Sequence, residues 1–148
     1  MKNDLHMKPV IVESPYAAKD LQDTPQFEIN LAYMRSCLRD CLLKHEAPFA
    51  SHAIYTQPGV LVDEIEEDRI LGIKAGFAVR KLYTASIFYV DLGMSNGMNW
   101  GMKAAEELQK ENGHRVEIRT LGLEWTVKYN ELLKKFPNRK IWGVTVGI

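Results

Sequence analysis

The chain has 148 residues, the length of one ordinary domain with a hydrophobic core of its own. Hydrophobic residues make up 46% and charged residues 26%, a mixture that excludes a disordered chain. Lysine plus arginine and aspartate plus glutamate number 19 each, so the net charge is zero. This balance argues against a nucleic-acid-binding protein, which needs a basic face to neutralise phosphates.

The first half of the chain predicts two strands, each followed by a helix. Residues 10–12 form a β-branched run that ends at Pro15, typical of a buried strand leading into a loop. Residues 24–42 begin with Thr-Pro and repeat apolar side chains on one helical face. Residues 47–55 predict the second strand, and residues 63–82 predict a helix that begins acidic and ends basic, as the helix dipole favours.

The second half repeats this alternation. Residues 87–92 predict a third strand, residues 98–111 a helix closed by Asn-Gly, and residues 116–121 a fourth strand. Residues 124–136 predict a last helix, and residues 141–146 a fifth strand.

Strands and helices that alternate at spacings too long for hairpins predict a parallel sheet. We therefore expect one α/β domain over residues 1–148, Rossmann- or flavodoxin-like, with a five-stranded, mostly parallel sheet and helices on both faces. Residues 1–9 are expected to be a flexible polar start, and residues 122–148 a C-terminal helix and strand that serve assembly. Ligands of such sheets bind beyond the carboxyl ends of the strands, here the loops after Val12, Tyr55 and Leu92.

The sequence also bears on compartment and cofactors. Cys37 and Cys41 lie four residues apart in the first predicted helix, and we interpret them as reduced, packed cysteines. The polar start is not a signal peptide, and no apolar run approaches the roughly 18 residues of a membrane span. We therefore predict a cytoplasmic protein without membrane contact. The histidines and the acidic run at residues 63–68 match no metal-ligand spacing, so we predict neither a metal nor a cofactor.

The loop after the third predicted strand is the most informative part of the chain. Asp91 ends the strand, and Ser95, Asn96 and Gly97 lead into a helix at Met98. Free backbone N–H groups and the positive end of the helix dipole suit an anion such as phosphate. The same residues fit ordinary helix capping, since Ser-x-Gly before a helix is common. A phosphate site and a helix cap stay open as alternatives.

Polar side chains follow the other predicted strands as well. Glu13, Ser14 and Tyr16 come after the first strand and could hold a sugar hydroxyl, and Arg35 could bind a phosphate through paired hydrogen bonds. Arg35 taken alone fits better as a solvated helix residue.

The second predicted strand carries His52 and Tyr55 near its end. His52 could act as an acid or a base. A lone histidine on a strand is more often a hydrogen-bonded packing residue, so both interpretations stay open.

These strand ends resemble the nucleoside 2-deoxyribosyltransferase superfamily, which includes deoxynucleoside-monophosphate N-glycosidases and small phage-borne relatives. The matching motifs are VIVESPY at residues 10–16, FASH at 49–52 and DLGMSNGM at 91–98, and residues 46–61 are similar to the phage-associated branch. The resemblance implies that the loop after the third strand binds the sugar or its 5′-phosphate, with Ser95 and Gly97 in matching places. It also implies a homo-oligomer, a dimer or higher, in which a neighbour often completes the pocket.

The chain departs from that superfamily at the nucleophile. The superfamily's glutamate lies four residues after the glycine of Ser-x-Gly, where this chain has Gly101, which cannot attack an anomeric carbon. The superfamily's aspartate on the preceding helix falls near Ala75. One hypothesis is an enzyme that hydrolyses or transfers a nucleoside or nucleotide N-glycosidic bond, in which the missing acid is replaced by Asp91, Glu13 or His52. The other is a non-catalytic protein that binds or sequesters a nucleotide.

Overall fold

The computed structural model describes residues 6–17 and 24–135, in which strands and helices alternate as predicted. In chain order, the elements along these residues are β1 (Lys8–Glu13), α1 (Thr24–Leu43), β2 (Glu46–Phe49), α2 (Ser51–Ile54), α3 (Glu66–Arg80), β3 (Ala85–Tyr89), α4 (Asn96–Asn112), β4 (Arg115–Arg119) and α5 (Trp125–Lys135). The fifth strand predicted at residues 141–146 lies outside the described residues, as do the first five residues of the predicted polar start. Within the described ranges, no helix has the length and apolar character needed to cross a membrane.

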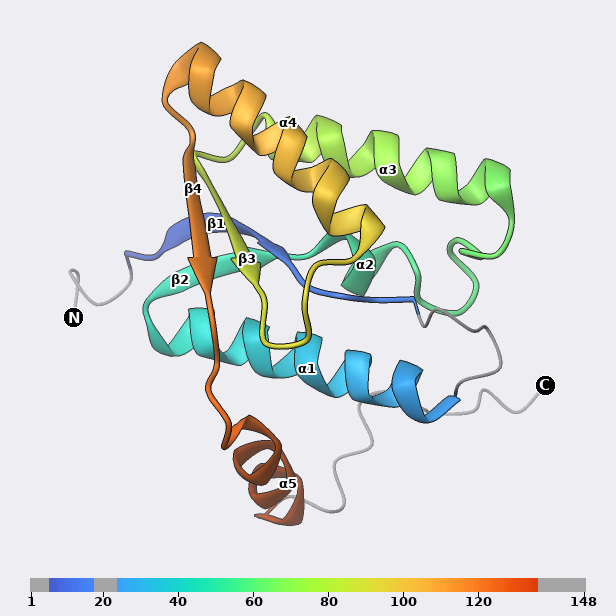
Figure 1. Cartoon of the computed structure of the whole chain (residues 1–148), viewed down its shortest axis with the longest axis vertical. Coiled ribbons are helices and arrows are strands. Elements are labelled where there is room, and N and C mark those ends of the chain that lie inside the picture. The colour runs from blue at the N-terminus through green and yellow to red at the C-terminus, as the bar shows by residue number, and fades with distance from the viewer. Residues whose placement is uncertain (1–5, 18–23, 136–148) are drawn as a thin grey trace.

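The described strands form one parallel sheet in the order β2-β1-β3-β4. The chain moves from β1 outward to β2 and then returns past β1 to β3, so the direction of winding reverses between β1 and β3. α1, with α5 packed against it, lies on one side of the sheet, and α3 and α4 lie on the other (Figure 1). The protein is therefore an α/β domain with a parallel sheet between helices, consistent with a Rossmann-like fold. The sheet has four strands within the described residues, rather than the five predicted.

The core follows the alternation of side chains along the strands. Val10 and Val12 of β1 pack into one buried cluster with α1. Phe88 of β3 packs into a second cluster with Met98 and Ala105 of α4. Every residue of β3 is buried, as expected of a central strand with helices over both faces.

The second strand is shorter than predicted. β2 ends at Phe49, and His52 belongs to the short helix α2, so the strand predicted over residues 47–55 is wrong in its second half. The alternation of Ala50, His52 and Ile54 covers only a few residues, too few to separate a strand from one helical turn. β2 is also an edge strand, where Pro48 can be accommodated without a full set of ladder hydrogen bonds.

Cys37 and Cys41 are free and fully buried on the inner side of α1. Their burial confirms the predicted packing of the two cysteines. Burial raises the pKa of the Cys41 thiol to about 11, and it raises the pKa of Cys37 still further from its usual value.

Candidate functional site

A cavity of about 590 Å³ lies beyond the carboxyl ends of β1 and β3, where the direction of winding reverses. α3 and α4 form its other side. Its volume falls within the roughly 300–1,000 Å³ of small-molecule sites. The sequence-predicted site residues that line it are Glu13, Ser14, Tyr16, His52, Ser95, Asn96, Gly97 and Met98.

An ion pair between Glu13 and Arg80 lies at the buried end of the cavity. Glu13 ends β1 and Arg80 ends α3, and their side chains are 15% and 4% exposed. Arg80 also donates from Nη1 to Ser86 Oγ at 2.7 Å, and Ser86 Oγ is 2.7 Å from His114 Nε2. His114 Nδ1 lies 3.0 Å from the carbonyl oxygen of Tyr83, so Nδ1 carries the hydrogen and Nε2 accepts from Ser86. This chain of bonds holds the Arg80 guanidinium from the side away from the cavity.

Glu13 and Arg80 depend on each other electrostatically. Burial raises the pKa of Glu13, and the positive charge of Arg80 opposes that rise. Arg80 Nε is buried and has no hydrogen-bond partner among the described residues. An unpaired charge in such surroundings is strongly destabilising, so each side chain requires the other.

Gly101 of α4 lies against this ion pair. A Cβ at position 101 would stand 2.5 Å from Glu13 Oε1 and 3.0 Å from Arg80 Nη2, closer than van der Waals contact permits. Gly101 is itself buried. The missing side chain of residue 101 therefore makes room for the Glu13 carboxylate, which reaches in from β1.

Ser14 and His52 form a second polar pair at the cavity. Ser14 directly follows β1 and is 3% exposed, and its Oγ is 2.8 Å from Nε2 of His52. The ring of Tyr16 meets the His52 ring edge-on, with 6.2 Å between their centroids. Burial lowers the pKa of His52 to about 4, so the imidazole is neutral near pH 7.

The loop after β3 ends in a capped helix. Ser95 is the N-cap of α4, and its Oγ accepts a hydrogen bond from the backbone nitrogen of Met98 at 3.2 Å. The capping alternative is thus present in the structure. The first N–H groups of a helix have no partner within the helix, and Asn96 and Gly97 are exposed and line the cavity. Capping by Ser95 and anion binding by these N–H groups are therefore compatible.

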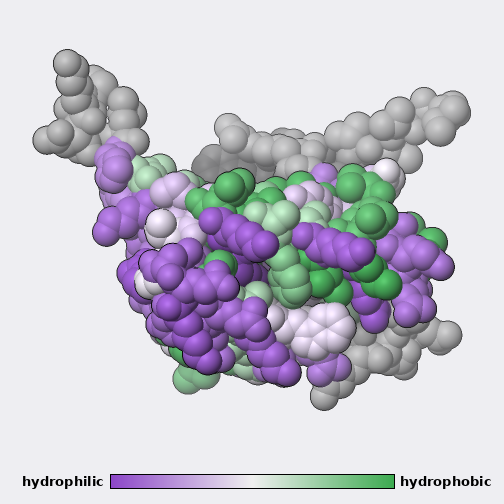
Figure 2. Space-filling model, turned by 90° about the horizontal axis from the view of Figure 1, so that it is seen from above, coloured by the Kyte–Doolittle hydropathy of each residue, from purple (hydrophilic) through white to green (hydrophobic). Residues whose placement is uncertain are grey.

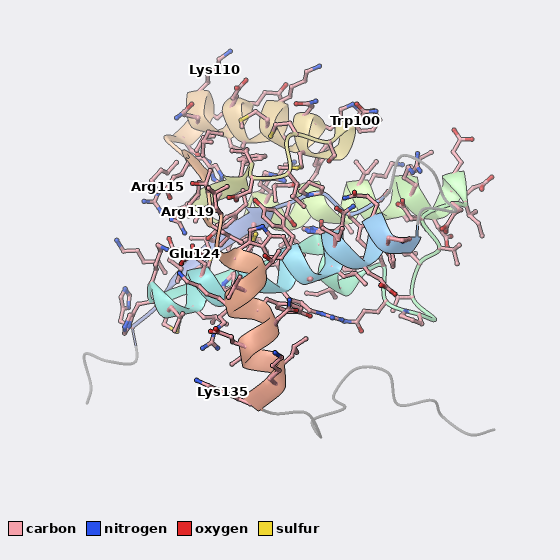
Figure 3. The ribbon with its side chains drawn as sticks, turned by 60° about the horizontal axis from the view of Figure 1, so that its bottom comes forward. Trp100, Lys110, Arg115, Arg119, Glu124 and Lys135 are labelled. Carbon is pink, nitrogen blue, oxygen red and sulfur yellow. The ribbon has the colours of Figure 1, made fainter. Side chains whose placement is uncertain are left out.

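The mouth of the cavity carries charged and aromatic side chains. Arg69 and Asp63 line it and form an ion pair of 3.7 Å. Phe77 and Trp100 also line it and are 36% and 54% exposed, and Trp100 lies near the N-terminal end of α4 (Figure 3). The side of the molecule that carries α3 and α4 shows hydrophobic surface between hydrophilic residues (Figure 2). Aromatic surface beside a polar cavity suits a ligand with a flat ring.

Asp91 points to a different part of the molecule. Its carboxylate accepts hydrogen bonds from the Tyr33 hydroxyl and from the backbone nitrogens of Leu121 at 2.8 Å and Gly122 at 3.0 Å. Burial acts to raise the pKa of Asp91, but the bonds from Tyr33, Leu121 and Gly122 lower it overall. Asp91 does not line the cavity and ties β3 to α1 and to the loop before α5.

Arg35 and Tyr55 also lie apart from the cavity. Arg35 is exposed and donates to the hydroxyl of Tyr129 in α5 at 3.3 Å. Tyr55 packs against Phe49 with 6.2 Å between ring centroids and borders a side pocket of about 80 Å³. The solvated interpretation of Arg35 matches its position.

Most of these helices and strands fall within a stretch that matches a known protein family. Residues 8–115 match the family described as a domain of unknown function (DUF7768), well over half of the chain. The chain belongs to this family. Every residue that lines the cavity falls inside the matched stretch, whereas α5 lies beyond it. No curated protein and no solved structure matches the chain.

Arg80 is the main site residue that sequence reasoning missed. A basic residue in the last turn of a helix is explained by the helix dipole, so its position gave no functional signal. Its spacing did carry a signal, because Arg69, Ile73, Gly76 and Arg80 recur at one helical face and all line the cavity. Among the described residues, no group of three or more His, Cys, Asp or Glu side chains is arranged to hold a metal ion.

Proposed function

We propose that the protein binds a nucleoside or nucleotide in this cavity and cleaves its N-glycosidic bond, with Glu13 as the catalytic carboxylate. The observation that carries the proposal is the position of Glu13 Oε1, 2.5 Å from where a Cβ of residue 101 would lie. In the nucleoside 2-deoxyribosyltransferase superfamily, which the sequence resembles, position 101 corresponds to the nucleophilic glutamate. A carboxylate thus reaches the same part of the cavity from β1 instead of from α4.

The cavity has distinct surfaces that fit the parts of a nucleotide. The N–H groups at the start of α4, beside Ser95, suit a phosphate or a sugar hydroxyl. Glu13 lies at the buried end, where the sugar would meet it. Phe77 and Trp100 at the mouth provide flat apolar surface for a base.

The chemistry requires a negative group close to the sugar. Cleavage of a glycosidic bond passes through a state in which positive charge develops on the sugar ring. A carboxylate in a site shielded from water stabilises that charge strongly. Arg80 holds Glu13 in position, and its own position is fixed by Ser86.

A non-catalytic nucleotide-binding protein is the second candidate function. The ion pair favours it, because a carboxylate bonded to Arg80 is less available to a reacting sugar. The start of α4 would bind a phosphate equally well without any reaction.

Release of free base from a panel of ribo- and deoxyribonucleosides and their 5′-monophosphates separates the two candidates. We expect the wild type to release base from at least one of them and Glu13→Gln to be slower by about 100-fold or more. Glu107→Gln, on an exposed position of α4, is the matched control and should keep the wild-type rate. No release, together with a thermal shift from one nucleotide, would reject cleavage and support binding. No release and no thermal shift would reject both.

We also propose that the protein forms a homo-oligomer, as the superfamily resemblance implies. α3 exposes large apolar side chains that no described element covers, among them Ile70 at 43% and Leu71 at 56% exposed. Light scattering of the full chain should give at least twice the monomer mass, and Leu71→Glu should lower it. A monomer mass at all concentrations would reject the proposal.

A further inference from the structure

The pair formed by Ser14 and His52 has no part in the proposal for Glu13, yet it borders the same cavity. Ser14 follows Glu13 directly in the chain, and His52 comes from α2, just after the neighbouring strand β2. Their 2.8 Å contact joins two strand ends at the cavity. A serine hydroxyl bonded to an imidazole nitrogen is an arrangement that can transfer a proton.

The direction of the hydrogen bond follows from the charge state of His52. Because burial lowers the pKa of His52 to about 4, the ring is neutral near pH 7 and offers one nitrogen as an acceptor. When Nε2 is that acceptor, Ser14 donates its hydroxyl hydrogen to it. The lone pairs of Ser14 Oγ can then accept a hydrogen from a molecule in the cavity.

We propose that Ser14 and His52 form a proton relay that activates a water molecule, so that the bond cleavage at this site is hydrolysis rather than transfer between bases. This inference rests on the proposed function. The water oxygen forms a bond to the anomeric carbon as the carbon–nitrogen bond breaks. The water proton passes to Ser14 Oγ, while the Ser14 proton passes to His52 Nε2. The base leaves with the bonding electron pair and takes up a proton from solvent, and His52 later releases its proton to solvent.

Glu13 and the relay have different tasks in this scheme. The Glu13 carboxylate stabilises the positive charge on the sugar, and the relay removes a proton from the attacking water. Attack by a water molecule that Ser14 and His52 activate requires no covalent intermediate on the protein. The scheme therefore accounts for the absence of a side chain at Gly101.

Other charged groups surround His52 and bear on its titration. Glu13 and Tyr16 line the cavity from β1 and the loop after it, Arg80 lines it from α3, and Asp63 and Arg69 line its rim. Asp68 borders a side pocket together with His52. Glu13 and Asp63 are each paired with an arginine, so their charges partly cancel. The pKa of Glu13 is raised by burial, so protonation of Glu13 and protonation of His52 both lower the rate at acidic pH.

The test uses His52→Ala and Ser14→Ala in the full chain, with His6→Ala and Ser36→Ala as matched controls. His6 is exposed and Ser36 donates to the Ala32 carbonyl oxygen on α1, and neither lines the cavity. We measure kcat and KM for base release on the substrate found in the panel, the pH dependence of kcat from pH 3.5 to 8, and thermal unfolding. Added imidazole serves as a rescue for His52→Ala.

Both relay variants should lose about 100-fold or more in kcat with little change in KM. The wild-type rate should fall at acidic pH as Glu13 and His52 take up protons, and added imidazole should restore part of the rate of His52→Ala. A purely structural pair would instead lower the unfolding temperature or raise KM, without imidazole rescue, and that result would overturn the relay. If the wild type releases base but both variants keep their rate, the relay is wrong while the proposed function stands. If the wild type releases no base from any compound, both the relay and the proposed bond cleavage are rejected.

Discussion

Gly101→Ala tests whether the Glu13–Arg80 pair really fills the space beside position 101. An alanine Cβ would lie 2.5 Å from Glu13 Oε1 and 3.0 Å from Arg80 Nη2, so one of these side chains must move. Overpacking of this kind costs about 1–3 kcal/mol, and complete loss of a buried ion pair costs about 3–5 kcal/mol. Replacing a helical glycine by alanine stabilises the helix by about 1 kcal/mol. We therefore expect a net loss of about 2 kcal/mol.

Gly97→Ala in the same helix is the control, because a Cβ there would meet nothing closer than Ser95 Oγ at 3.9 Å. This variant should be as stable as the wild type or gain up to about 1 kcal/mol. For a chain of this length, a difference of 2–3 kcal/mol separates the two unfolding temperatures by about 5–10 °C. Urea unfolding of Gly101→Ala, Glu13→Ala and the double variant should give a coupling of about 2 kcal/mol, because removing Glu13 relieves the contact. A Gly101→Ala protein as stable as Gly97→Ala, or no coupling, would refute the geometry.

Three further expectations concern the capped helix, the Asp91 carboxylate and the cysteines. Ser95→Asp keeps a good N-cap, so the free energy of unfolding should stay within about 0.5 kcal/mol of the wild type. Its added negative charge should lower the affinity for a nucleoside 5′-monophosphate by about 10-fold or more, measured by calorimetry. An unchanged affinity would exclude phosphate binding at the start of α4. The pKa of Asp91 is lowered on folding, so its bonds stabilise the protein above the unfolded value near 3.8 and this stability is lost as the pH falls through the folded value. Urea midpoints at pH 5 and pH 3 should therefore differ more in the wild type than in Asp91→Asn, and equal differences would contradict the assignment. Cys37 and Cys41 are fully buried, so a thiol reagent at pH 8 should label neither in the native protein and both in urea, and rapid native labelling would contradict their burial.

Part of the alternation of strands and helices could be predicted because β1 contains a β-branched run and α1 repeats its apolar residues on one face. The run at residues 10–12 lies in β1, and the periodic segment at residues 24–42 lies in α1, as predicted. α2 could not be predicted, because four residues contain too little periodicity to separate a turn of helix from an edge strand. The third strand is predicted to end at residue 92, but β3 ends at Tyr89. Val90 continues the apolar run, so the sequence does not mark where the strand ends.

The position of the cavity could also be predicted, because the carboxyl ends of parallel strands meet at one edge of the sheet. That rule brought Glu13, His52 and Ser95 to the same place. It could not tell which strand-end side chain turns into the cavity and which turns away, as Asp91 does. Nor could it reveal Arg80, because Arg80 and Glu13 are 67 residues apart in the chain and meet only through the tertiary fold.

The contacts of Asp91 have a consequence for how this fold can diversify. Two of its hydrogen bonds come from the backbone nitrogens of Leu121 and Gly122. Position 121 needs only a residue other than proline, whereas Gly122 has a φ of 95°, which favours glycine. The family match ends at residue 115, before this loop begins. A chain that keeps this loop and Trp125, which packs on Tyr33, could therefore vary the rest of α5 in sequence or length and still attach it at the same point of the sheet. Asp91 is thus the point at which the C-terminal segment is attached to the sheet, and it does not line the cavity.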